Sequence, residues 1–232
     1  MSLSFAQRWE SIQNRVAQAA HRAGRSREGV TIVGVSKKHS AQACEEAFSL
    51  GIAHLGENYV AEWTEKARVL SDRGIQPSWH FIGALQSKKA KHIVGKNVLV
   101  HSLDRLSLAS ALEKTGQRLG AQTRCLIQVN ASADPRKGGI ALEDLPPFLE
   151  SLLPFNELQI EGLMCIPAAG LSAGETHRVY ASVRKALEPL QQVFPEASSL
   201  SMGMSNDFEI AVQEGATHIR VGTALFGPRV TA

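Results

Sequence analysis

Short apolar runs alternate along the chain with longer segments that carry apolar residues at helical spacing. Most of the short runs are continuously apolar, which is typical of parallel strands buried on both faces. We predict eight strands, at Val30–Ser36, Ala53–Leu55, Trp79–Ile82, Val98–Val100, Thr123–Val129, Gln159–Cys165, Ser199–Ser201 and His218–Val221.

The segments between these runs predict amphipathic helices, because their apolar residues recur three and four positions apart. Ser4 is the expected N-cap of a helix that precedes the first strand. Gly74 can end a later helix, on which Glu62 and Lys66 form an i,i+4 ion pair. Pro189 interrupts the last pattern and predicts a kink or an early end. The four clearest stripes are Phe5, Trp9, Ile12 and Val16; Val60, Trp63, Ala67 and Leu70; Leu145, Phe148, Leu149 and Leu152; and Val179, Val183, Leu187 and Leu190.

Strand and helix patterns alternate about eight times, which predicts either a closed barrel or a doubly wound sheet. Eight repeats in one chain favour the barrel. The length of 232 residues suits one barrel, which typically needs about 250 residues. We therefore expect residues 1–232 to form a single (β/α)₈ TIM barrel domain with an additional N-terminal helix.

Composition adds few functional signals to this picture. Lysine and arginine outnumber aspartate and glutamate by 25 to 22, which is ordinary surface charge and does not indicate a nucleic-acid partner. No apolar run approaches the roughly 18 residues of a membrane span. Cys44, Cys125 and Cys165 form no C-x-x-C pair, so we expect reduced core cysteines of a cytoplasmic protein and no metal site.

Polar residues of interest follow the first strand, at the end where barrels carry their chemistry. A partly desolvated lysine there is a candidate for attack on an aldehyde. Lys37 and Lys38 both qualify. The residues alone favour the alternative of an exposed loop lysine, because lysines are mostly exposed. Strand alternation places Lys37 on the face of Val33 and Val35 and places Lys38 on the other face. Periodicity does not say which face points inward.

Glycine and hydroxyl residues follow the last two strands. Gly203 and Ser205 come after the seventh strand, and Gly222 and Thr223 come after the eighth. Barrels often bind phosphate with these two loops, through backbone N–H groups and hydroxyl donors. Ser205 and Thr223 could also be simple helix N-caps. The two interpretations are compatible, since a capped helix N-terminus also attracts anions.

Three further polar residues allow a structural and a functional interpretation. A buried Arg220 needs an acceptor, which could be a carboxylate such as Asp207 or Glu57, or an atom of a ligand. Asn58 could cap the following helix or contact a ligand. We expect His80 to be a hydrogen-bonded core histidine.

Taken together, these strand ends resemble the pyridoxal-phosphate homeostasis protein family, which is related to the barrel domain of bacterial alanine racemases. The motifs that carry the resemblance span the chain from the first strand to the last. They are V-S-K (Val35–Lys37), G-E-N-Y-V (Gly56–Val60), H-F-I-G-x-L-Q (His80–Gln86), K-x-G (Lys137–Gly139), G-L-M-x-I-P (Gly162–Pro167), L-S-M-G-M-S-x-D (Leu200–Asp207) and R-V-G-T-A-L-F-G (Arg220–Gly227).

The resemblance implies a pyridoxal 5′-phosphate site, with no catalytic residue and no metal. Lys37, rather than Lys38, matches the lysine that forms the internal aldimine. The resemblance also implies that Ser205, Gly222 and Thr223 contact the phosphate and that Arg220 contacts the pyridine nitrogen. Asn58 and Met202 match residues that line the pocket.

The implied arginine bears on catalysis, because a guanidinium stays protonated and keeps the pyridine nitrogen unprotonated. Such a ring is a weak electron sink. Racemases of this arrangement use two bases, one of them a tyrosine from a second domain, which we do not expect here. We therefore expect a monomeric, non-enzymatic carrier or buffer that passes the cofactor to apo-enzymes and influences amino-acid and keto-acid pools. The alternatives are an amino-acid racemase or decarboxylase, and an aldolase that uses Lys37 on a sugar phosphate.

Overall fold

The computed structural model describes residues 3–134 and 137–228, and eight parallel strands close into a barrel within them. Each strand pairs with the next one along the chain, and the last pairs with the first, so that Thr31 lies beside His218. The strands are β1 (Thr31–Val35), β2 (His54–Glu57), β3 (Ser78–Phe81), β4 (Val98–Leu103), β5 (Thr123–Val129), β6 (Leu158–Cys165), β7 (Ser199–Ser201) and β8 (His218–Val221).

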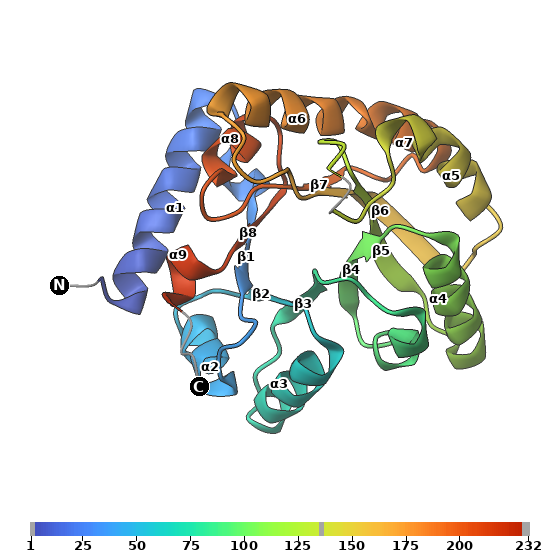
Figure 1. Ribbon diagram of the computed structural model, residues 1–232. Coiled ribbons are helices and arrows are strands. Elements are labelled where there is room, and N and C mark those ends of the chain that lie inside the picture. Colours follow the sequence, from blue (N-terminus) through green and yellow to red (C-terminus); the bar gives the residue numbers. More distant parts are fainter. Residues whose placement is uncertain (1–2, 135–136, 229–232) are drawn as a thin grey trace.

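Helices surround this ring of strands, as Figure 1 shows. The strand–helix alternation confirms the predicted TIM barrel and its N-terminal helix. The helices are α1 (Phe5–Arg22), α2 (Ala41–Ser49), α3 (Val60–Asp72), α4 (Leu106–Leu119), α5 (Leu145–Leu152), α6 (Ala173–Lys185), α7 (Leu187–Val193), α8 (Phe208–Gln213) and α9 (Thr223–Phe226).

All eight predicted strands are present, but two end later than the sequence pattern predicts. β2 continues to Glu57, and β4 continues past Val100 to Leu103. The added residues include Glu57, His101 and Ser102, which are polar and nevertheless buried. A hydrophobicity pattern assigns such residues to loops, because it cannot detect polar side chains that are satisfied inside a barrel.

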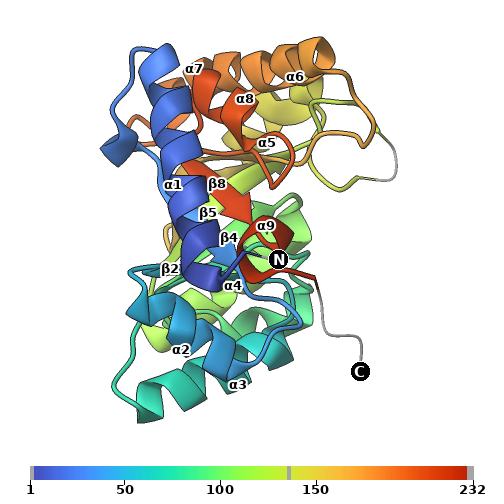
Figure 2. The ribbon, with the colours of Figure 1, turned by 90° about the vertical axis from the view of Figure 1, so that its left-hand side faces the viewer.

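The N-terminal helix α1 begins as predicted, with Ser4 as its N-cap in a capping box with Gln7. It packs against α8 and α9, beside β8 (Figures 1 and 2). Arg8 donates to the carbonyl of Leu225 in α9 at 2.7 Å, and Arg15 pairs with Glu209 of α8. The helix therefore supports α8 and α9, which follow the C-terminal ends of β7 and β8.

The pattern around Pro189 corresponds to two helices rather than one. α6 ends at Lys185, and α7 begins at Leu187 with Pro189 inside its first turn. Proline has no N–H to donate and is tolerated there, whereas it would disrupt one continuous helix. The predicted break is confirmed, three residues before the proline itself.

The barrel interior is a separate environment from the main core between strands and helices. Leu99, Leu126 and Met164 form a small apolar cluster of their own, against which Ile166 packs. None of the helices in residues 3–134 and 137–228 is long and apolar enough to cross a membrane.

Candidate functional site

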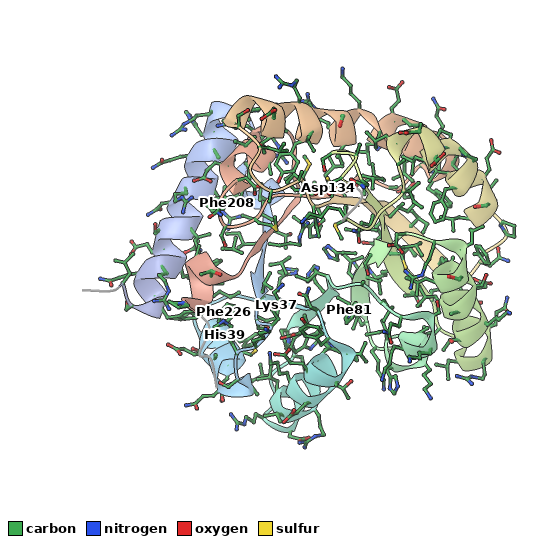
Figure 3. The ribbon with its side chains drawn as sticks, viewed as in Figure 1. Lys37, His39, Phe81, Asp134, Phe208 and Phe226 are labelled. Carbon is green, nitrogen blue, oxygen red and sulfur yellow. The ribbon has the colours of Figure 1, made fainter. Side chains whose placement is uncertain are left out.

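A cavity of about 660 Å³ opens at the C-terminal ends of the strands. Its lining includes six of the seven residues that the sequence marks as a site, contributed by the ends of β1, β2, β7 and β8. They are Lys37, Asn58, Ser205, Arg220, Gly222 and Thr223. In the view of Figure 3, Lys37 lies at the edge of the ring of strands, beside β1 and β2. The structure thus brings together residues that are up to 186 positions apart in the chain (37 to 223).

The structure distinguishes Lys37 from Lys38. Lys37 is half-buried and lines the cavity together with Val35, whereas Lys38 is exposed. An added side chain at Gly34 would meet Leu225 of α9, so the alternate residues of β1 face the helices. The face that carries Val35 and Lys37 is therefore the inward one, which periodicity left open.

Asn58 lies directly after β2 and is not a helix cap. The N-cap position of α3 is Tyr59, which makes no side-chain capping bond. The side-chain oxygen of Asn58 is buried and has no hydrogen-bond partner among the described residues. A buried polar atom without a partner is unfavourable, so an acceptor oxygen beside this cavity is suited to contact a ligand.

The loop after β7 turns sharply at Gly203, which has a φ of +95° and packs against α8. Asp207 stabilises the turn that follows, since its carboxylate accepts from the Met204 amide at 2.6 Å and from the Tyr180 hydroxyl at 3.0 Å. This turn carries Ser205 at the cavity wall. Ser205 is not a helix N-cap, because Asp207 occupies that position for α8. The Ser205 hydroxyl instead accepts from the Ala224 amide in α9 at 3.4 Å.

The loop after β8 passes directly into the four-residue helix α9. Gly222 occupies the N-cap position without a side-chain capping bond, and Thr223 is the first helical residue, exposed at the cavity. Thr223 is therefore not the N-cap. The hydroxyls of Ser205 and Thr223 lie on two adjacent loops that the bond from Ala224 to Ser205 links together.

Arg220 is 4% exposed and donates three hydrogen bonds to neutral oxygens. Two go from one guanidinium nitrogen to the carbonyl and hydroxyl of Ser201, both at 2.7 Å, and one goes to the Cys165 carbonyl at 2.9 Å. The carboxylate partner considered from the sequence is wrong, because Asp207 bonds to Tyr180 and Glu57 pairs with Lys66.

The remaining donors of Arg220 matter for ligand binding. A guanidinium has five N–H groups, and the described residues accept from three of them. Burial lowers the pKa of Arg220, yet a guanidinium remains cationic in proteins. The cavity therefore contains a fixed positive charge with donors to spare.

Met202 is the one predicted site residue that does not line the cavity. It is fully buried, and its amide donates to the carbonyl of His218. Met204 and Lys137 also line the cavity, and the sequence pattern predicts no role for either. Both fall within the family motifs, so the motifs contained a signal, but not the direction of each side chain.

Beneath the cavity, a chain of hydrogen-bonded histidines crosses the barrel interior. His54 of β2 bonds to His80 of β3, His80 bonds to His101 of β4, and His101 bonds to the Ser201 hydroxyl, each at 2.9 Å. Ser201 in turn accepts from Arg220 at 2.7 Å. His80 is thus a hydrogen-bonded core histidine, as predicted. A neutral imidazole has one donor and one acceptor, which suits a ring that makes two such bonds.

We expect acid to destabilise the protein through these histidines. Burial and the neighbouring rings lower the pKa values of His80 and His101 well below normal, and burial lowers that of His218 to about 4, with His54, Arg124 and Arg220 contributing. Between pH 6.5 and 4 the unfolded chain therefore binds more protons than the folded one. Stability should be complete above pH 6.5 and fall as the pH decreases towards 4, with His218 alone contributing about 3 kcal/mol.

Urea unfolding at a series of pH values between 7 and 4.5 tests this expectation. His218→Gln cannot titrate and should flatten the dependence, whereas His92→Gln, a matched change at an exposed position, should leave it unchanged. Equal slopes for the wild type and the His218 variant would contradict the assignment.

The fold and the cavity can be compared with known proteins. Residues 8–230 match the family model described as alanine racemase, N-terminal domain. The pyridoxal phosphate homeostasis protein of Pseudomonas aeruginosa is 39% identical over 227 residues, which cover 97% of this chain and 96% of that protein.

Solved structures agree with the sequence comparison. PipY of Synechococcus elongatus, solved with PLP bound, superimposes with a TM-score of 0.84 at 38% identity, covering 97% of this chain and 100% of PipY. Alanine racemase from Corynebacterium glutamicum has a TM-score of 0.69 at 16% identity, covering 93% of this chain and 60% of the racemase. The second likeness shows a shared barrel fold.

Proposed function

The chain belongs to the family of pyridoxal phosphate homeostasis proteins, and on that premise we propose that it binds pyridoxal 5′-phosphate through the amine of Lys37. The observation that supports this most directly is the convergence of Lys37, Arg220 and the Ser205 and Thr223 hydroxyls on one cavity. When bound, pyridoxal 5′-phosphate supplies an aldehyde that reacts with amines.

The residues of the cavity fit this cofactor in chemical type. Lys37 supplies the amine for the aldehyde, and the two hydroxyl-bearing loops supply donors for the phosphate. Arg220 has donors for an acceptor such as a ring nitrogen, and Asn58, whose buried side-chain oxygen has no partner among the described residues, lines the same cavity. The cavity thus offers a partner to each polar end of the cofactor.

We propose a carrier or buffer role rather than catalysis. Arg220 can only donate, so it favours an unprotonated ring nitrogen and weakens the ring as an electron sink. The sequence has two tyrosines. Tyr180 is fully buried and bonded to Asp207, and burial raises its pKa, while Tyr59 is exposed and lies outside the cavity lining. Neither tyrosine is placed to exchange a substrate proton.

Transfer of the cofactor to another protein tests the carrier role. Lys37 would release the aldehyde when a second amine replaces it, which an apo-enzyme or an amino acid can provide. The loaded protein is mixed with an apo-enzyme that requires pyridoxal 5′-phosphate, and the recovery of activity is followed. Recovery should be faster than the dissociation measured with an aldehyde-trapping reagent. Recovery at the dissociation rate would exclude carrier transfer.

Proton exchange distinguishes the alternative, an amino-acid racemase or decarboxylase. The loaded protein is incubated with amino acids in deuterated water, and deuterium at the α-carbon is measured. We expect no exchange above that caused by the free cofactor. Exchange at a turnover rate of about 1 s⁻¹ or more, the lower range of typical enzymes, would establish catalysis instead.

The phosphate end of the site yields a separate prediction. Ser205→Ala removes a hydroxyl from the cavity wall, and a hydrogen bond to a charged group contributes about 1.5–3 kcal/mol. We expect affinity for pyridoxal 5′-phosphate to fall by at least about tenfold, with little change for pyridoxal, which lacks the phosphate. Ser198→Ala, at an exposed position preceding β7, is the control. Equal losses for both vitamers would remove Ser205 from the phosphate site.

A further inference from the structure

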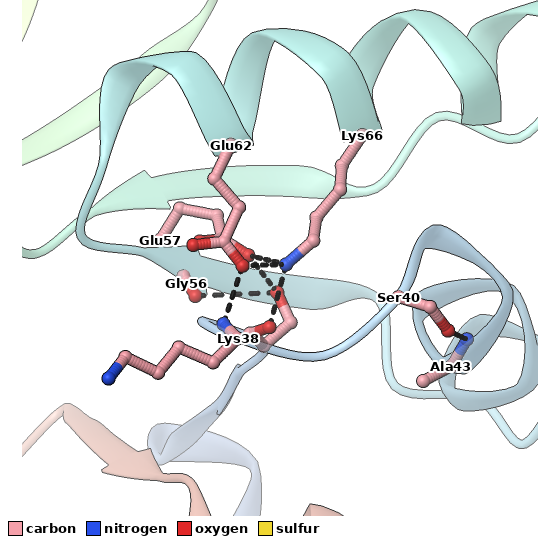
Figure 4. Close-up of polar contacts among 8 residues, drawn as sticks. Lys38, Ser40, Ala43, Gly56, Glu57, Glu62 and Lys66 are labelled. Carbon is pink, nitrogen blue, oxygen red and sulfur yellow. Dashed lines mark hydrogen bonds and ion pairs between the residues drawn. The ribbon is translucent and has the colours of Figure 1, made fainter. Parts of the chain in front are cut away.

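A buried cluster of charged residues lies between β1, β2 and α3, and it contacts the two residues that flank Lys37. The ammonium of Lys66 donates to the carboxylate of Glu57 at 2.6 Å, to that of Glu62 at 2.7 Å and to the carbonyl of Ser36 at 2.7 Å. These contacts converge on one nitrogen in Figure 4. The sequence predicted the ion pair of Glu62 and Lys66. It did not predict that Lys66 is buried or that Glu57 and Ser36 also bind its ammonium group.

The cluster contacts the backbone on both sides of Lys37. On one side, Lys66 binds the Ser36 carbonyl, and the Ser36 hydroxyl donates to Glu57 at 2.6 Å. On the other side, the amide of Lys38 donates to the same Glu62 oxygen that Lys66 contacts. The peptide groups that flank Lys37 are therefore held by side chains from β2 and α3.

The backbone at Lys38 requires such support. Lys38 has a φ of +63°, a left-handed conformation that is unfavourable for residues with a side chain. Such conformations persist where surrounding contacts determine them, and they are concentrated at functional sites. The left-handed residue comes directly after Lys37, which itself lies two residues beyond the end of β1. The Lys38 side chain extends away from the cluster (Figure 4).

The cluster is a costly way to gain stability alone. The Lys66 and Glu57 side chains are 5% and 0% exposed, and desolvation offsets much of the attraction in a buried ion pair. The second carboxylate oxygen of Glu57 has no hydrogen-bond partner among the described residues. Apolar side chains could fill the same space, so the specific geometry of the charged groups calls for another explanation.

Lys66 itself does not compete with Lys37 as an amine for the cofactor. Burial alone would lower the pKa of Lys66, but its hydrogen bonds to Glu57 and Glu62 outweigh burial and raise it. All three ammonium hydrogens also have acceptors in the cluster. Lys66 is therefore kept protonated and is not a nucleophile.

Resting on the proposed function, we propose that Glu57, Glu62 and Lys66 form a positioning network that fixes the backbone on both sides of Lys37 and thereby directs its amine into the cavity. None of the three lines the cavity, so they act through the backbone rather than on the cofactor.

The central test is Glu62→Ala, because Glu62 is the most accessible member, with 24% of its side chain exposed. The variant and the wild type are incubated with pyridoxal 5′-phosphate, reduced with borohydride at a series of times and mapped by mass spectrometry. We expect labelling of Lys37 to slow, and affinity to fall, by about tenfold, as for the loss of one charge-assisted hydrogen bond. Glu65→Ala, an exposed position on the same helix, should behave as the wild type.

A second readout follows the contact itself in the protein without cofactor. Exchange of the Lys38 amide with deuterated solvent should accelerate in Glu62→Ala and not in Glu65→Ala. Lys66→Met should reproduce both effects. Leu112→Ala, in the buried face of α4, lowers stability elsewhere and should leave labelling and affinity unchanged, which separates positioning from general destabilisation.

The possible results separate the two proposals. If the wild type carries no label on Lys37, the proposed function fails and the inference falls with it. If the wild type is labelled at Lys37 and Glu62→Ala labels as fast and binds as tightly, the positioning network is overturned and the proposed function stands. Slower labelling with faster Lys38 exchange in the folded variant supports both.

Discussion

Replacing Lys37 with alanine should abolish borohydride-stable attachment of pyridoxal 5′-phosphate to this segment and weaken binding by at least about tenfold, or 1.4 kcal/mol. The physical reason is that the covalent link contributes affinity that the remaining contacts of the cavity cannot replace. Peptide mapping after reduction measures the attachment, and equilibrium dialysis measures the affinity. The visible colour of the loaded protein should be lost together with the label.

Lys38→Ala is the matched control, since it removes the neighbouring amine of the same motif. Lys38 is exposed, and its contact with Glu62 is made by its backbone amide, which alanine retains. This variant should keep the label on Lys37 and its affinity. Loss of the label in Lys38→Ala with retention in Lys37→Ala would reverse the assignment of the two lysines.

The barrel itself could be predicted from the sequence because its strands are short, apolar and regularly spaced. The predicted strands at 123–129, 199–201 and 218–221 match the structure at both ends. Errors occur where polar residues are buried, as at the end of β4. There His101 and Ser102 continue the strand, because the His101 ring bonds to the Ser201 hydroxyl and the Ser102 hydroxyl donates to the Gly83 carbonyl. A pattern of hydrophobicity carries no information on such partners.

In the candidate site too, some features could be predicted from the sequence and others could not. Residues that belong to loop motifs, such as Gly222 and Thr223, could be located from the sequence, because a closed barrel gathers its strand ends on one face. The partners of buried charges could not. Lys66 appears in the sequence as a surface residue of an amphipathic helix, and only the structure, in which α3 contacts β2, reveals that it binds the Ser36 carbonyl after β1.

Arg220 has a position that the sequence predicts and hydrogen-bond partners that it does not. Its position in the last strand could be predicted, but its anchors, Ser201 and Cys165, come from the two preceding strands. Through Ser201 it also joins the histidine chain. The cationic side of the site is therefore supported by the barrel interior, and the amine side by the cluster between β1, β2 and α3.

Gly83→Ala is expected to destabilise the protein strongly and to disturb the site as well. Gly83 follows β3 within the H-F-I-G-x-L-Q motif, and an added Cβ would lie 2.3 Å from the carbonyl oxygen of Asn58 and 2.7 Å from its Cα. Such distances cannot be accommodated without moving the backbone, because the obstructing atoms do not belong to a flexible side chain. We expect a loss of about 3 kcal/mol, the upper end of the range for overpacking.

The same displacement would move Asn58, which lines the cavity, so affinity for pyridoxal 5′-phosphate should fall together with the free energy of unfolding. Urea unfolding and equilibrium dialysis measure the two effects. Gly174→Ala is the matched control, because its added Cβ would meet only the end of the Arg178 side chain, at 3.9 Å, inside helix α6. That change should leave the free energy of unfolding equal to or slightly above that of the wild type, because alanine favours the helix. Equal stability of Gly83→Ala and the wild type would mean that the Asn58 backbone is free to yield, and that the close approach of the two segments does not define the site.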